Sequence, residues 1–168
     1  KGGAESMIDQ YIRQYGKRLY GLCLSLCANQ FEADDLYQDT WLRVMKNISQ
    51  YDSNRDFEPW LTKICVNTYR NALRRIARSP LLNFKTNEEK DAMLCAVPAA
   101  ENPDYSSLYE AIERLPEKYR LVVILFYFED MDVAATADAM GIPERTVKSR
   151  LSKARKLLKE VLEHETDI

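Results

Sequence analysis

Hydrogen-bond donors and positive charges are most concentrated in one stretch near the end of the chain, MGIPERTVKSRLSKARKLL. Between Pro143 and Glu160 the sequence has seven Lys or Arg residues and two Glu, a local net charge of +5 in a chain whose net charge is −2. Such side chains bind phosphates and the edges of bases in the DNA major groove. The residues that we predict to make these contacts are Arg145, Thr146, Lys148, Ser149, Arg150, Ser152, Lys153 and Lys156. Of the cations in this stretch, those best suited to phosphate contacts are Arg150, Arg155 and Lys156.

One helix from about Pro143 to Glu160 would position these side chains. Apolar residues recur along it at the helical period and predict a buried side, with the basic and hydroxyl side chains opposite. These apolar residues are Val147, Leu151, Ala154, Leu158 and Val161. Upstream, the small Ala137 and the turn residue Gly141 have the spacing of a helix-turn-helix, whose second helix enters the major groove. The alternative is an ordinary solvated helix face without a partner.

Charges of opposite sign are also separated in the first half of the chain. The segment Leu61–Ser79 has five Lys or Arg residues and no acid, whereas FEADDLYQD upstream has four acids and no base. This separation indicates two partners of opposite charge, one of them nucleic acid. Between the two segments, Tyr51, Phe57 and Trp60 could stack on unpaired bases. For Phe57 and Trp60 the competing interpretation is packing in the core.

The Asp-rich sequence DDLYQD also admits a metal-binding interpretation. Asp-rich helices can hold Mg²⁺ when oxygen ligands converge from more than one element. The other acidic cluster, EEKD, falls in a segment that we predict to be a linker. We therefore predict no catalytic residues, no metal site and no cofactor.

The composition predicts an all-α protein of two small helical domains. The chain has 168 residues, only five glycines and little strand-like alternation. Helical spacing predicts one long or two short helices over 8–29, with Gly16 as a candidate break. It predicts a second helix with a buried stripe, and a third over about 58–78 with Pro59 in its first turn. The residues assigned to that stripe are Leu36, Thr40, Val44, Ile48, Trp41 and Met45.

Residues 80–104 show no sustained periodicity, and we predict a flexible linker there. The predicted domains are therefore 1–79 and 105–168, the second containing the helix-turn-helix. No apolar run approaches the roughly 18 to 20 residues needed to cross a bilayer, so we expect no membrane insertion. The spacing of Cys23, Cys27, Cys65 and Cys95 matches no metal motif, and we expect reduced thiols in a cytoplasmic protein.

Two segments of the chain together resemble a known family. The sequence ADDLYQDTWLRVMKNISQYDSNRDFEPWLTKICVNTYRNALRR is similar to region 2 of bacterial extracytoplasmic-function (ECF) sigma factors. The sequence IERLPEKYRLVVILFYFEDMDVAATADAMGIPERTVKSRLSKARKLL is similar to their region 4. The resemblance implies a subunit of RNA polymerase, not an enzyme, that directs promoter recognition. An autonomous helix-turn-helix regulator is the alternative.

The resemblance also implies partners and contact residues. Core RNA polymerase would bind through its largest-subunit clamp helices and its flap, and a cognate anti-sigma factor would regulate the protein. The clamp-binding residues implied are Asp34, Asp35, Leu36, Gln38 and Asp39. Those implied for the promoter −10 element are Tyr51, Asp52, Ser53, Asn54, Asn67, Arg70, Arg74 and Arg75. The basic helix described first would read the −35 element as duplex DNA.

Overall fold

The computed structural model describes residues 2–78 and 106–166. Every element in these two ranges is helical, which confirms the predicted all-α class. The chain divides into two compact units, Lys1–Val97 and Pro98–Ile168. The segment 80–104, predicted to be a linker, lies outside the described residues, and so does Cys95.

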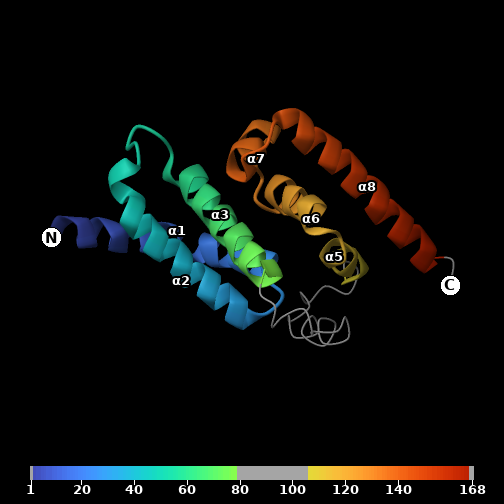
Figure 1. The fold of residues 1–168 in the computed structure, drawn as a ribbon, viewed down its shortest axis with the longest axis horizontal. Coiled ribbons are helices and arrows are strands. Elements are labelled where there is room, and N and C mark those ends of the chain that lie inside the picture. The colour runs from blue at the N-terminus through green and yellow to red at the C-terminus, as the bar shows by residue number, and fades with distance from the viewer. Residues whose placement is uncertain (1, 79–105, 167–168) are drawn as a thin grey trace. The chain divides into compact units, whose positions relative to one another are not determined.

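The N-terminal unit contains α1 (Gly2–Leu26), α2 (Gln30–Asn47), the short 3₁₀ helix η1 (Ile48–Gln50) and α3 (Phe57–Arg78) (Figure 1). Helix α2 packs against both α1 and α3, and α1 also packs against α3. The N-cap of α2 is Asn29, whose side chain accepts a hydrogen bond from the backbone N–H of Glu32 at 2.9 Å. The largest fully buried side chains of this unit are Leu22, Leu26, Thr40, Val44 and Val66.

Helix α1 is continuous through Gly16, so of the two alternatives the single long helix is correct, and Gly16 marks no break. The glycine instead allows α2 to approach α1 closely. A Cβ atom at Gly16 would lie 2.8 Å from the hydroxyl oxygen of Tyr37 on α2. The missing side chain therefore makes room for the Tyr37 ring between the two helices.

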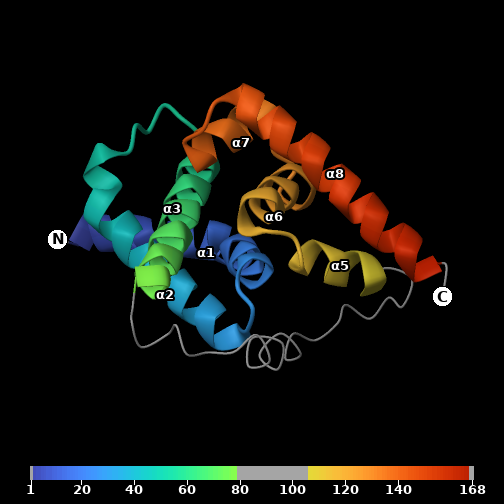
Figure 2. The same cartoon turned by 45° about the vertical axis from the view of Figure 1, so that its right-hand side comes forward.

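The C-terminal unit contains α5 (Ser106–Glu113), α6 (Glu117–Val123), the π-helical turn η3 (Ile124–Phe128), α7 (Val133–Met140) and α8 (Glu144–Thr166). Helix α8 runs along α7, α6 and α5 and packs against all three (Figure 2). Apolar side chains from all of its helices form its core, with the largest share from α6, η3 and α8. The most deeply buried of them are Leu121, Val122, Leu125, Val147 and Ala154.

Within the two described ranges, no helix combines the length and the apolar character that crossing a membrane requires.

Candidate nucleic-acid and partner interfaces

The turn between α7 and α8 has the geometry predicted for a helix-turn-helix. Asp132 caps α7, its carboxylate accepting a hydrogen bond from the Ala135 backbone N–H at 2.7 Å. Gly141 ends α7 in the left-handed region at φ 65°, which glycine adopts without strain. The Ile142 N–H then closes the turn on the carbonyl of Ala137 at 3.1 Å. Ala137 is buried on α7, the helix that packs against α8, in agreement with the small residue expected there.

Helix α8 separates its apolar and polar sides as predicted. Val147 and Ala154 have no exposed surface, and Leu151 is 3% exposed. Leu158 and Val161 are half-buried. On the other side, the exposed members of the predicted contact set are Arg145, Lys148, Ser149, Ser152, Lys153 and Lys156, and the half-buried ones are Thr146 and Arg150.

The cations of this surface have no neutralising partners in the part of the chain that the structure describes. None of the Lys or Arg residues between 145 and 156 forms an ion pair with a described carboxylate. Further along, Lys159 pairs with Glu163 at 3.6 Å. The positive potential of the first three turns of α8 therefore stays available to an anionic partner such as duplex DNA.

Helix α2 carries acidic residues in two different settings. Asp35, Gln38 and Asp39 are exposed. Asp34 is half-buried, and its carboxylate accepts a hydrogen bond from the Tyr20 hydroxyl of α1 at 2.7 Å. This hydrogen bond raises the pKa of Tyr20, because losing the proton would leave two negative groups in contact. Asp34 thus links two helices.

Of two other residues of α2, one lies in the buried stripe that the sequence pattern predicted and the other does not. Leu36, which the resemblance implied as a contact residue, is only 5% exposed and packs in the core. Met45, assigned to the buried stripe, is 51% exposed, so that assignment is wrong. It lies with Leu42, 54% exposed, one to two turns beyond Gln38. We call the exposed set Asp35, Gln38, Asp39, Leu42 and Met45 the acidic face of α2.

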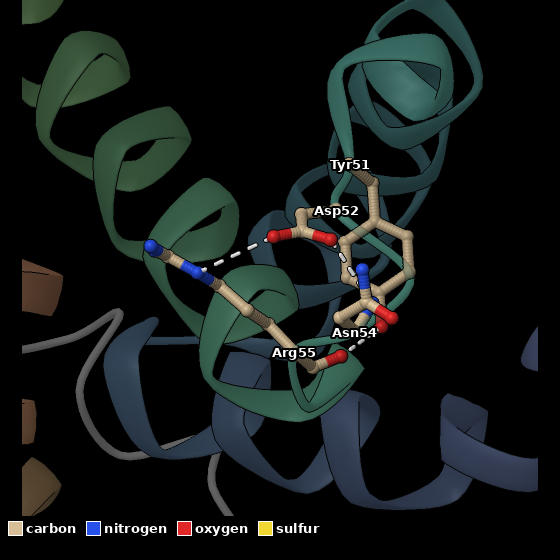
Figure 3. Close-up of polar contacts among 4 residues, drawn as sticks. All are labelled: Tyr51, Asp52, Asn54 and Arg55. Atoms are coloured by element: carbon tan, nitrogen blue, oxygen red, sulfur yellow. Dashed lines mark hydrogen bonds and ion pairs between the residues drawn. The ribbon is translucent and has the colours of Figure 1, made fainter.

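The loop between η1 and α3 is held by its own hydrogen bonds (Figure 3). The Asp52 carboxylate accepts from the Asn54 backbone N–H at 3.0 Å and lies 3.7 Å from Arg55 Nε. The Tyr51 hydroxyl donates to the backbone carbonyl of Arg55. These contacts turn the chain back on itself. Ser53 and Asn54 stand exposed at the tip of the loop.

Five aromatic rings fix this loop to α1 and α3. Phe57 is 3% exposed and stacks on Tyr11 at 4.1 Å between ring centroids, so its core-packing interpretation is correct. Tyr51 lies edge-on to Phe57 at 5.3 Å and 5.0 Å from Trp60. Burial against these rings raises the pKa of Tyr51. Tyr15 also packs on Phe57. Nothing local in the sequence links the two α1 tyrosines to a loop some 40 positions away, so no sequence pattern indicated them.

The remaining predicted nucleic-acid residues lie on α3. Asn67, Arg74 and Arg75 are exposed, and Arg70 is half-buried. Arg74 donates a hydrogen bond to the side-chain oxygen of Asn71 at 3.4 Å. After Glu58 this helix has no acid, so its exposed surface remains basic to its end.

The thiols and acids of the described residues form no metal centre. Within 2–78 and 106–166, no group of three or more His, Cys, Asp or Glu side chains could hold a metal ion. Cys23 and Cys65 are fully buried, with their sulfur atoms 3.9 Å apart. Their hydrogen bond and burial raise the pKa of Cys23 and keep it a thiol. Cys23 and Cys65 thus act as small core residues.

These features define a class: an all-α protein with a helix-turn-helix in its C-terminal unit and separate acidic and basic surfaces in its N-terminal unit. Two family models match the chain, sigma-70 region 2 over residues 11–79 and sigma-70 region 4 over residues 105–158. The chain belongs to the sigma-70 family and is an ECF sigma factor. It directs promoter-specific initiation of transcription, and its family consists of transcription regulators rather than catalysts.

Known proteins with similar sequences support this assignment, and the similarity extends over most of their length. The ECF RNA polymerase sigma factor SigW of Bacillus subtilis is 26% identical over 172 residues, covering 96% of this chain and 92% of SigW. The RNA polymerase sigma factor NccH of Alcaligenes xylosoxydans xylosoxydans is 28% identical over 167 residues, covering 96% and 89%.

Solved structures share the fold. The sigma factor RpoE in complex with the anti-sigma factor NepR, from Bartonella quintana, has a TM-score of 0.73 at 23% identity, covering 92% of this chain and 96% of that one. CnrH in complex with the cytosolic domain of CnrY has a TM-score of 0.67 at 20% identity, covering 95% and 90%.

Proposed function

We propose that this sigma factor divides its contacts among three surfaces. The acidic face of α2 binds core RNA polymerase, the loop at 51–56 with α3 reads the −10 element, and α8 reads the −35 element. The observation that carries the proposal is the placement of opposite charges on separate, exposed helix faces. On this basis the functional domains are 1–79 and 105–168, with 80–104 as the linker, and the protein works in the cytoplasm.

Core polymerase binding rests on the chemistry of the acidic face. Asp35 and Asp39 offer carboxylates to basic groups on the clamp helices, and Gln38 offers an amide between them. Leu42 and Met45 add apolar surface at one end, which supports a packed contact as well as an electrostatic one. Asp34 and Leu36 act indirectly, since one is bonded to Tyr20 and the other is buried. The flap of the polymerase would contact the C-terminal unit.

Reading of the −10 element rests on the structured loop. An extruded base can be recognised along its Watson–Crick edge by amide groups, which Asn54 and Asn67 supply from exposed positions. Ser53 is exposed beside Asn54, while Tyr51 and Asp52 keep the loop in one conformation. Arg70, Arg74 and Arg75 would hold the adjacent DNA backbone.

Reading of the −35 element rests on the exposed side of α8. In a helix-turn-helix the N-terminal half of the second helix contacts base edges. Arg145, Lys148, Ser149, Ser152 and Lys153 occupy that half and are exposed. Thr146, Arg150 and Lys156 flank them and are placed for phosphate contacts.

We also infer a cognate anti-sigma factor. Both solved structures described above are complexes with a partner protein. In one of them the partner, NepR, is named as an anti-sigma factor. The mixed acidic and apolar face of α2 suits a partner helix with basic and apolar residues. Such a partner would compete with core polymerase.

The test is transcription with purified components. The chain is mixed with core polymerase that lacks a sigma factor and then assayed on a library of promoter sequences. We expect co-elution with the core enzyme and transcripts from sites sharing −35 and −10 sequences. Failure of both would refute the proposal. Tight specific binding of the free chain to duplex DNA, unaffected by core polymerase, would favour an autonomous regulator.

A further inference from the structure

Tyr127 and Arg155 form a polar contact between two elements of the C-terminal unit. Tyr127 lies on η3 and Arg155 on α8, and Arg155 Nε donates a hydrogen bond to the Tyr127 hydroxyl at 2.8 Å. The guanidinium carbon lies 5.8 Å from the ring centroid. Both residues are exposed, so water competes for both groups and the contact contributes little to folding. What the contact does constrain is the orientation of the guanidinium.

The hydrogen bond leaves the outer end of Arg155 available. It uses the Nε–H donor, and the two terminal nitrogens have no partner among the described residues. A guanidinium is planar, so a bond at Nε and contact with a ring fix the direction of the whole fork. A fixed fork matches the oxygens of a phosphate in a bidentate contact and loses less entropy on binding.

Arg155 also lies on the side of α8 that we assign to DNA. It is seven positions beyond Lys148 and three beyond Ser152, which places all three on one helix face. Seven positions correspond to about 10 Å along the helix. The major groove is about 12 Å wide, so when Lys148 lies inside the groove, Arg155 reaches the phosphates at its edge.

We propose that Tyr127 is a positioning residue that aims Arg155 at a backbone phosphate beside the −35 element. The inference rests on the proposed role of α8 and extends the DNA interface to a residue upstream of the helix-turn-helix. Tyr127 itself acts only through Arg155.

Tyr127→Phe tests the proposal, because the variant keeps the ring and removes only the hydroxyl. Holoenzyme is reconstituted with each variant, and its affinity for a promoter found by the transcription assay is measured at several salt concentrations. We expect Arg155→Ala to weaken binding about fivefold to tenfold and to reduce the salt slope by about one. We expect Tyr127→Phe to weaken binding about twofold to threefold. In an Arg155→Ala background, Tyr127→Phe should have no further effect.

Tyr109→Phe is the matched control, since Tyr109 is another exposed tyrosine of the same unit. We expect it to leave affinity and salt slope unchanged. Unchanged affinity in Tyr127→Phe, or an equal loss with Arg155 already removed, would overturn the proposal. A loss of affinity in Tyr127→Phe that comes with a lower unfolding temperature, together with an unaltered salt slope in Arg155→Ala, would make the pair a structural link only and overturn the proposal as well.

Failure of the proposed function gives a different result. If wild-type holoenzyme binds promoters equally well after the −35 element is scrambled, the assignment of α8 is wrong and this inference falls with it. If wild-type binding does depend on the −35 element and Tyr127→Phe behaves like Tyr109→Phe, only the inference fails.

Discussion

Helices α2 and α8 are both amphipathic and both carry a proposed binding surface, yet they use their polar residues differently. Helix α8 packs along one side of its unit, and all eight predicted contact residues are exposed or half-buried. Helix α2 packs against α1 and α3. Its acids are divided, because Asp34 bonds to Tyr20 whereas Asp35 and Asp39 face outward. On a helix whose neighbours all lie along one side, the exposed residues are those that the sequence pattern predicts. On a helix packed between two neighbours, contacts with both neighbours change which residues are exposed.

The largest expected effect concerns the buried side of α8. Leu151→Ala removes a side chain that is packed in the core of the C-terminal unit. We expect it to lower the free energy of unfolding of that unit by about 2–4 kcal/mol, because the cavity adds to the lost transfer energy. Urea denaturation followed by circular dichroism measures this. Ser152→Ala, on the exposed side, should change it by less than about 0.5 kcal/mol, and similar values for the two variants would contradict the assigned sides.

The next effect concerns the acidic face of α2. Asp39→Arg reverses an exposed charge, so we expect core-polymerase affinity to fall by at least about tenfold, since like charges would then meet across the interface. Asp9 is exposed on α1, so Asp9→Arg makes the same change in net charge away from this face and should have little effect on core-polymerase affinity. Fluorescence anisotropy with labelled sigma factor gives both affinities. Equal affinities for the two variants would exclude this face as the polymerase contact.

A smaller effect separates two cations of α8. Lys153→Ala removes an unpaired exposed charge, and we expect the salt slope of promoter binding to fall by about one. Lys159 pairs with Glu163, so Lys159→Ala should reduce the slope less. Holoenzyme binding at several salt concentrations measures both. An unaltered salt slope in Lys153→Ala would show that the exposed side of α8 is an ordinary solvated face that does not bind DNA.

The smallest effect tests the division of acids on α2. Tyr20→Phe removes the hydrogen bond to Asp34, so we expect a small drop in unfolding temperature and unchanged affinity for core polymerase. The hydrogen bond to the Asp34 carboxylate raises the pKa of Tyr20, so this bond stabilises the fold at neutral pH and is lost only as alkaline pH ionises the phenol. Thermal denaturation and anisotropy provide the two readouts. A strong loss of polymerase binding would show that Asp34 needs Tyr20 to act at the interface.

Much of the fold and of the candidate site could be predicted from local patterns. The period of Val147, Leu151 and Ala154 identified the buried side of α8, and Gly141 marked the turn by the positive φ that it adopts. Helix α3 begins one residue before the predicted start. These features depend on residues within a few turns of one another, so the sequence carries them directly.

Other parts of the site depend on residues that are distant in the chain. Tyr11 stacks on Phe57, and Tyr127 receives a hydrogen bond from Arg155, 28 positions away. Gly16 lies where α1 and α2 pack closely and does not break α1, because Tyr37 approaches it from α2. No local pattern indicates such pairs.

The sequence by itself determined the main helices, the helix-turn-helix and the sign of charge on each surface, since all of these follow from the helical period, from turn residues and from charges close together in the chain. Only the tertiary structure decided which side of α2 stays exposed, which acid is bonded inward and which rings hold the 51–56 loop. The physical reason is that burial on a helix with two neighbours depends on how the helices cross. That crossing depends on contacts among side chains far apart in the chain.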